Sequence, residues 1–246
     1  MMLDAIRLSI GTFTRFPVRP PSHLDRPVAG LAISLAPLTA TVLGLLAGLP
    51  LLIHRAPVVS AVICLALLTW LTRGLHLDGL ADTADALGSG KPAEQALQIA
   101  RKSDIGPFGV LVLIFSIIAS TSSLCAINGD AHRYWSLLLA LVTSRVGVVW
   151  ACTKWLPPAR DHGLGATVAQ STRVSVAIGW TALVTSLWAW WGGAEALLVP
   201  LIACTAATSI LIICRRRLGG VTGDVFGATI ECAFVAALVT AALIGA

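Results

Sequence analysis

Charged residues are scarce in this sequence of 246 residues: only 12% are Asp, Glu, Lys or Arg, whereas 57% are hydrophobic. Soluble domains carry about 25% charged residues, so a soluble fold with this composition could not cover its surface with polar side chains. CxxC pairs are also absent, and the six cysteines lie within or beside apolar runs, which favours small core residues over disulfides or metal ligands. These shortages together predict an all-α membrane protein.

Long apolar runs take the place of the missing charge. A helix that crosses a membrane needs roughly 20 apolar residues, and about seven stretches qualify. We therefore expect a transmembrane helical bundle that forms one integral-membrane domain over residues 1–246. Before the first span, apolar residues at helical spacing in residues 3–16 predict an amphipathic helix on the membrane surface. The predicted spans are residues 30–53, 57–74, 108–127, 134–152, 174–192, 194–213 and 225–245.

Basic residues are distributed unevenly between the connections that join these spans. Fourteen of the 17 lysines and arginines fall on one side, Arg55 and Arg133 fall on the other, and Arg145 lies within a span. Loops rich in Lys and Arg stay in the cytoplasm, so we predict an N-terminus inside the cell and a C-terminus outside it, in the cytoplasmic (inner) membrane. The net charge of +5 then reflects orientation in membrane lipid and indicates no nucleic-acid partner.

Aromatic residues and glycines within the spans carry weaker predictions. Trp188, Trp190 and Trp191 are expected to form an aromatic belt at the outer end of the fifth span. Gly44 and Gly48 form a GxxxG pattern, which allows two helices to approach closely. This pattern is weak evidence for dimerisation in a glycine-rich chain, so a homo-oligomer is left open.

Carboxylates collect on the predicted cytoplasmic side, where ten of the 12 acidic residues fall. The densest group lies in residues 75–107, which we predict to be a cytoplasmic acidic active-site loop. Asp78, Asp82 and Asp85 are spaced i, i+4 and i+7, so they share one face of a helix. Three carboxylates so close repel one another unless a cation neutralises them, and oxygen-only ligands favour Mg²⁺. A solvated acidic helix end is the alternative.

Two further segments carry candidate phosphate-binding groups. In residues 101–104, two cations are followed by a hydroxyl and a carboxylate, and the two cations can meet phosphate oxygens. Ordinary flanking of a span is the alternative for the basic pair. In the second, a glycine-rich loop at residues 219–223 leads into a helix, as in many phosphate sites. Asp224 follows this loop, and the alternative for it is a role as the N-cap of the next helix. The candidates are Arg101, Lys102, Ser103, Asp104 and Asp224.

Three polar residues lie inside or beside the spans. Glu231 is seven residues beyond Asp224 and on the same helix face, and a carboxylate within a membrane is a functional hypothesis by default. Arg145 lies at a similar predicted depth, so the two residues are candidate partners, either at a catalytic site or in a structural ion pair. His76, beside the acidic group, is either a general base or donor or an interfacial polar residue.

Taken in order, these segments resemble the cobalamin synthase family, the adenosylcobinamide-GDP ribazoletransferases (cobalamin 5′-phosphate synthases). The most specific part is the string His-x-Asp-Gly-x-x-Asp-x-x-Asp that begins at His76. Ile105 departs from the pattern, because a more polar residue is expected there. The matching stretches cover essentially the whole chain and are residues 13–18, 74–85, 102–109, 163–165 and 223–231.

The resemblance implies a Mg²⁺-dependent transfer in which adenosylcobinamide-GDP and α-ribazole, or α-ribazole 5′-phosphate, are joined and GMP is released. Such a displacement depends mainly on positioning and charge neutralisation, which the carboxylates and basic residues can supply. We expect the metal ligands to be Asp78, Asp82 and Asp85, the catalytic residues to be His76, Asp104, Asp224 and Glu231, and the substrate-binding residues to be Arg15, Arg101, Lys102, Ser103 and Arg145.

Two other functions are compatible with clustered acids on membrane helices. A CDP-alcohol-type phosphotransferase carries Asp-Gly-x-x-Ala-Arg, whereas Gly79 here is followed by Leu80, Ala81 and Asp82. An ion-coupled transporter places its charges near the membrane midplane and has discontinuous helices in both halves. The acids of this chain cluster at one face, which argues against a transporter.

Overall fold

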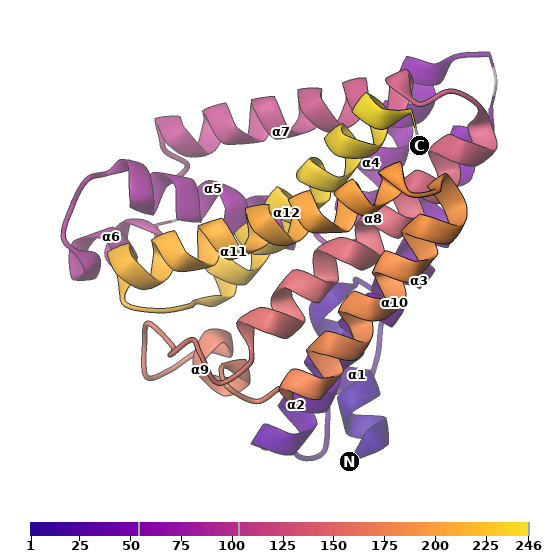
Figure 1. The fold of residues 1–246 in the computed structure, drawn as a ribbon. Coiled ribbons are helices and arrows are strands. Elements are labelled where there is room, and N and C mark those ends of the chain that lie inside the picture. Colours follow the sequence, from indigo (N-terminus) through magenta and orange to yellow (C-terminus); the bar gives the residue numbers. More distant parts are fainter. Residues whose placement is uncertain (54, 103, 246) are drawn as a thin grey trace.

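The computed structural model describes residues 1–53, 55–102 and 104–245, and its regular elements in these ranges are helices (Figure 1). The all-α prediction is therefore confirmed. The α-helices are α1 (Met2–Phe13), α2 (Arg26–Ser34), α3 (Ala36–Ala47), α4 (Pro57–Leu71), α5 (Leu75–Gly88), α6 (Ala93–Ile99), α7 (Pro107–Ala126), α8 (Asp130–Ala151), α9 (Leu164–Val168), α10 (Val174–Gly192), α11 (Leu198–Leu218) and α12 (Gly223–Ile244), and the short 3₁₀ helices are η1 (Leu49–Leu52) and η2 (Glu195–Leu197).

Six helical segments in the described ranges are long and apolar enough to cross a membrane, which confirms a multi-pass membrane protein. The helices α2 and α3 together form the first, α7, α8 and α10 each form one, η2 with α11 forms the fifth, and α12 forms the sixth. A seventh crossing arises if α4 and α5 count as one broken span. The count of about seven therefore depends on this helix pair.

The second predicted span, residues 57–74, differs from the structure. Helix α4 ends at Leu71, and the chain bends by 87° before α5 begins. Arg73 and Gly74 both have positive φ angles, 58° and 67°, which reverse the local helical sense; glycine adopts this conformation freely and arginine does not. Arg73 is held there because its guanidinium donates a hydrogen bond of 2.8 Å to the carbonyl oxygen of Gly11. The bend directs α5 back against other helices.

Helices α8 and α12 form the middle of the bundle. The segment of α8 is the most buried of the candidate spans, and α12 packs against α5, α8 and α11. Figure 1 shows α5 between α7 on one side and the α11–α12 pair on the other, and the contacts of α5 with α7 and α12 agree. The segment 75–107, which was predicted to be a loop, is therefore mostly helical and belongs to the bundle.

Two predictions about side chains inside the spans have different outcomes. Trp188 was assigned to an outer aromatic belt, but its side chain is fully buried and its indole N–H donates to the hydroxyl of Thr143 at 2.9 Å, so this assignment is wrong. The GxxxG pattern does allow close packing, within the chain itself. A Cβ atom on Gly44 would lie 3.2–3.4 Å from atoms of Leu138 and Leu141, so α3 lies directly on α8.

Candidate active site

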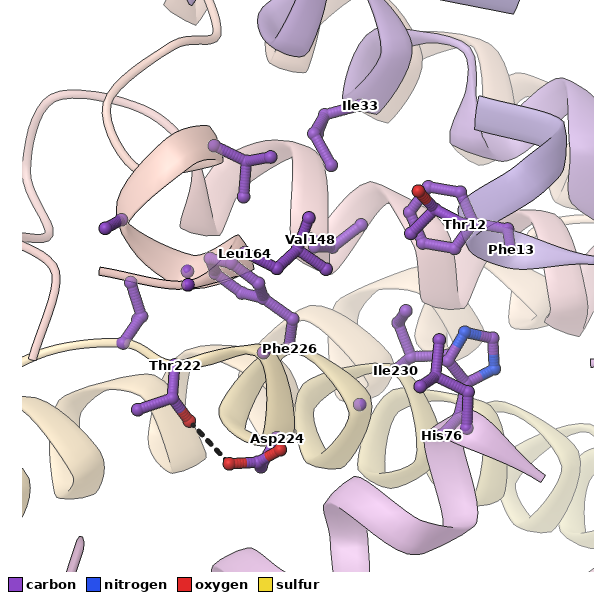
Figure 2. Close-up of a pocket in the computed structure, with 18 of the residues that line it drawn as sticks. Thr12, Phe13, Ile33, His76, Val148, Leu164, Thr222, Asp224, Phe226 and Ile230 are labelled. Atoms are coloured by element: carbon purple, nitrogen blue, oxygen red, sulfur yellow. Dashed lines mark hydrogen bonds between the residues drawn. The ribbon is translucent and has the colours of Figure 1, made fainter. Parts of the chain in front are cut away.

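An apolar cavity of about 300 Å³ opens where α1, α2, α5, α8, α9 and α12 meet (Figure 2). Most of its wall is hydrocarbon or aromatic, and its polar groups come from the end of α1, from α5, from the start of α12 and from the segment before α9. The cavity therefore offers an apolar interior with a polar edge. The main apolar residues are Phe13, Ile33, Val148, Val168, Phe226 and Ile230, and the polar residues are Thr12, His76, Asp78, Arg160, His162, Thr222 and Asp224.

A second, charged cavity of about 300 Å³ lies between α5 and the segment that precedes α7. Four of the predicted charged site residues besides Asp78 line it. Asp78 lines both cavities, so the apolar and the charged cavity meet at this side chain. The residues that line the charged cavity are Asp78, Ala81, Asp82, Ala100, Arg101, Lys102, Asp104 and Ile105.

Two glycines bring the carboxylates of α5 and α12 together. A Cβ atom on Gly79 would lie 2.7 Å from the carbonyl oxygen of Asp224, and one on Gly227 would lie 3.1 Å from that of His76. The two helices therefore touch backbone to backbone, and a larger residue would push them apart. As a result, Asp82 experiences the negative charge of Asp224 on the other helix as well as that of Asp78.

Thr222 begins α12. Its hydroxyl accepts a hydrogen bond from the backbone N–H of Val225 at 3.2 Å and donates to the carboxylate of Asp224 at 3.2 Å (Figure 2). The N-cap is therefore Thr222, and Asp224 lies in the first helical turn, where a carboxylate is stabilised by the helix dipole. The alternative in which Asp224 is the N-cap does not hold.

Asp85 lies apart from the other two acids of its motif. Its carboxylate is buried and accepts the backbone N–H groups of Gly106 at 2.7 Å and of Gly109 at 2.9 Å. These are donors at the start of α7, which would otherwise lack partners. Asp85 lines neither cavity. Its position explains how the charged segment before α7 is attached to α5, and its assignment as a metal ligand stays a prediction.

Arg160 and His162 are polar residues of the apolar cavity that were not among the predicted site residues. A guanidinium N–H of Arg101 donates to Nε2 of His162 at 3.0 Å, which links the two cavities at their edge. Burial and the neighbouring Arg101 lower the pKa of Arg160, and the carboxylate of Asp224 acts in the opposite direction. Their loop is held by Ala159, whose N–H donates to the carbonyl oxygen of Val221 at 2.9 Å.

His76, which lines the apolar cavity, also belongs to a buried set of polar side chains with Arg145 and Ser144. A guanidinium N–H of Arg145 lies 3.3 Å from Nδ1 of His76, and a second donates to the hydroxyl of Ser144 at 2.9 Å. Arginine only donates, so Nδ1 of His76 accepts and the imidazole proton is on Nε2. That Nε2 atom is buried and has no hydrogen-bond partner.

Glu231 and Arg145 line the same small cavity of about 40 Å³, which confirms that they lie close together. Among the described residues, however, no ion pair within 4.0 Å joins them. The guanidinium instead bonds Ser144 and His76, and Glu231 acts on it across the cavity. The two residues are therefore electrostatic neighbours, and Arg145 is directed at His76.

Of the four remaining predicted site residues, two line the charged cavity. Asp104 and Lys102 are exposed on the charged cavity, whereas Ser103 lies outside the described residues. Arg15 lines neither cavity, because its guanidinium carbon lies 3.7 Å from the centre of the Trp70 ring, in a cation–π contact. Its substrate contact stays a prediction.

The sequence model of cobalamin-5-phosphate synthase matches residues 5–242. The chain belongs to the cobalamin-5-phosphate synthase family. Three relatives are named adenosylcobinamide-GDP ribazoletransferase: one from Frankia casuarinae is 37% identical (99% of this chain, 95% of the relative), one from a Nocardioides species 35% (96% and 97%), and one from Rhizobium etli 38% (87% and 84%). No solved structure matches the chain.

Membership of the cobalamin-5-phosphate synthase family confirms the resemblance predicted from the motifs. The protein is an enzyme of cobalamin synthesis, a transferase with several membrane helices. This favours the transferase over the CDP-alcohol phosphotransferase and the transporter.

The acidic residues fit a magnesium ion that is shared with a substrate. In the described ranges, no three His, Cys, Asp or Glu side chains converge into a closed metal cage. Mg²⁺ does not need one, because it usually takes one or two carboxylates and completes its shell with waters and substrate phosphates. Asp78 and Asp82, one helical turn apart on the charged cavity, supply such a pair of oxygen ligands.

Proposed function

We propose that the protein joins adenosylcobinamide-GDP to α-ribazole, or to α-ribazole 5′-phosphate, and releases GMP in a Mg²⁺-dependent reaction. One observation carries the proposal: two cavities of opposite character meet at Asp78. The charged cavity has the cations and carboxylates that a diphosphate and its metal require, and the apolar cavity suits a nucleoside. The relatives' names supply the two substrates.

In this reaction a ribazole hydroxyl attacks the phosphorus that carries the cobinamide. The new P–O bond joins ribazole to that phosphate, the P–O bond to the GMP phosphate breaks, and GMP leaves with the electron pair. The hydroxyl proton passes to a carboxylate, and we assign this role to Asp224, which borders the apolar cavity beside Asp78. The attack takes place where the two cavities meet.

Asp78 and Asp82 would hold the magnesium ion, which when bound neutralises the negative charge of the diphosphate. Arg101 and Lys102 line the same cavity and would contact the phosphate that leaves with GMP. Asp85 acts through the backbone, because its hydrogen bonds to Gly106 and Gly109 hold the segment that carries these cations against α5. The substrate phosphates are thus positioned by charged groups from two segments.

We place the active site on the cytoplasmic side of the cytoplasmic (inner) membrane. The fourteen-to-two distribution of basic residues supports this orientation, since Arg101, Lys102 and Arg160 all belong to the larger set. The acceptor and donor substrates would then approach from the cytoplasm, and the products would leave on the same side.

GMP release tests the proposed function. The full-length protein in detergent should release GMP only when adenosylcobinamide-GDP, α-ribazole and Mg²⁺ are all present. Asp78→Asn should lower the rate by at least about 100-fold, since it removes a charge at the reacting phosphate. Asp161→Asn is the matched control, because Asp161 is exposed and lines neither cavity. Absence of GMP release by the unaltered protein, or an unimpaired Asp78→Asn variant, would refute the proposal.

A further inference from the structure

The interior of the apolar cavity has a composition that restricts what can enter it. Figure 2 shows Ile33, Val148 and Phe226 around its middle, Phe13 at one side, and Asp224 with Thr222 at an edge. The side chains of the six main apolar residues cannot form ordinary hydrogen bonds. Thr12, beside Phe13, adds one hydroxyl to this side of the wall. A ligand that inserts here must therefore present a largely apolar surface inward and keep most of its polar groups near Asp78 and Asp224.

The size of the cavity sets a second restriction. At about 300 Å³, it lies at the lower end of the range of small-molecule sites, roughly 300–1,000 Å³. A nucleoside is of this size, whereas a corrin macrocycle with its side chains is several times larger. The corrinoid substrate must remain outside, with its diphosphate in the charged cavity, and only the smaller substrate can be enclosed.

His76 adds a third, independent restriction. Its Nε2 carries the imidazole proton, because Nδ1 accepts from Arg145. Among the described residues that line the apolar cavity, His76 is the one with a buried side-chain atom, Nε2, that has no hydrogen-bond partner. A buried donor without an acceptor is unfavourable, so a ligand with one acceptor on an otherwise apolar body would complete the site.

Given the proposed function, we propose that the apolar cavity binds the base of α-ribazole, an apolar bicyclic ring, with its free ring nitrogen accepting the Nε2 proton of His76. The base is a dimethylbenzimidazole, which in the nucleoside has no hydrogen-bond donor and one ring-nitrogen acceptor. Its ring and methyl groups lie against Phe13, Val148 and Phe226, and the ribose extends toward Asp78 and Asp224. The same cavity thereby selects the class of base that is incorporated.

Binding of the nucleoside alone tests this inference. The cavity is lined by the protein itself, so titration calorimetry of the full-length protein in detergent should detect α-ribazole without the corrinoid. The matched probe is the benzimidazole riboside that lacks both methyl groups. Each buried methyl group contributes about fourfold in affinity, so the probe, which lacks two of them, should bind about 15-fold more weakly.

A pair of adjacent variants provides the control. Val148 and Val149 are both fully buried on α8, and only Val148 lines the apolar cavity. Val148→Thr keeps the shape of the side chain and adds a hydroxyl to the cavity wall, so the affinity ratio of the two nucleosides should fall to about threefold. Val149→Thr carries the same change outside the cavity and should leave the ratio at about 15-fold.

The outcomes separate the base site from the reaction. Equal binding of the two nucleosides, no binding of α-ribazole, or the same ratio in both valine variants would overturn the base site, even if GMP release continues. Retained discrimination between the nucleosides, with no GMP release from adenosylcobinamide-GDP, would leave the base site standing and refute the proposed function.

Discussion

Substitution of Asp85 and Asp82 by asparagine separates a helix cap from a metal ligand. The two residues belong to one motif, yet Asp85 accepts two backbone N–H groups at the start of α7, whereas Asp82 lines the charged cavity. Asparagine is nearly the same size as aspartate, so neither change creates a void. Any difference between the two variants therefore reports on charge and hydrogen bonding.

The cost of Asp85→Asn follows from its two hydrogen bonds. The amide keeps one carbonyl oxygen as an acceptor and turns an NH₂ donor toward the other backbone N–H, so one charge-assisted bond is lost and one N–H is left without an acceptor. We expect a loss of about 2 kcal/mol. In a chain of this size that lowers Tm by about 4–8 °C. Asp82→Asn instead removes one of several repelling carboxylates, so without Mg²⁺ its Tm should stay the same or rise.

The assay uses the cysteines of the chain. Cys64, Cys152 and Cys214 are buried, so a dye that becomes fluorescent on reaction with thiols reports unfolding. GMP release as a function of Mg²⁺ concentration completes the comparison, and Asp82→Asn should raise the half-saturating concentration by at least about tenfold. If Asp85→Asn kept the normal Tm and raised the Mg²⁺ requirement as much as Asp82→Asn, Asp85 would be a ligand and the cap argument would fail.

Gly79→Ala should reduce turnover strongly, because its Cβ atom would lie 2.7 Å from the carbonyl oxygen of Asp224. Gly179→Ala is the control and should be neutral, because a Cβ atom there meets open space. Equal activity of the two variants would refute the close contact between α5 and α12. Glu231→Gln should destabilise the protein by about 1–3 kcal/mol, because it leaves the buried guanidinium of Arg145 without a neighbouring negative charge. Adding Arg145→Leu should recover Tm but not GMP release, because the carboxylate of Glu231 is still absent. Restored turnover in the double variant would reduce Glu231 to a scaffold residue. The orientation can be tested with single cysteines at the exposed positions of Lys91, Asn128 and Arg217 in a cysteine-free background. In intact cells, the cysteines at Lys91 and Arg217 should resist an impermeant thiol reagent, and the one at Asn128 should react. Labelling of the Lys91 position from outside would overturn the orientation.

The probe positions of the last experiment illustrate a limit of sequence-based design. Residues 219–223 form a glycine-rich cytoplasmic loop by sequence, which suggests that any position in it would accept a cysteine. In the structure, a Cβ atom on Gly220 would lie 2.3 Å from the carbonyl oxygen of Pro157, so a cysteine there would disrupt the contact with the loop that carries Arg160. The exposed Arg217 avoids this conflict.

Properties that depend on local composition could be predicted from the sequence alone. A shortage of charge and long apolar runs lead to a membrane bundle whatever the packing, because lipid requires every backbone group to be paired within helices. The motif around Asp78 and Asp82 likewise identifies the family and most of the charged site, since these residues and Arg101, Lys102 and Asp104 do line one cavity.

The tertiary structure decided what each of these side chains contacts. Asp78 and Asp85 share a helix face by spacing, but the start of α7 covers only the second, so two equivalent acids have different partners. Likewise, Trp188 is a core residue because Thr143 of α8 lies opposite, and Arg145 is directed at His76, 69 positions away in the chain. The pattern of a single helix determines which residues face the same way, whereas the neighbouring helix determines whether that face meets lipid, water, a backbone N–H or a substrate.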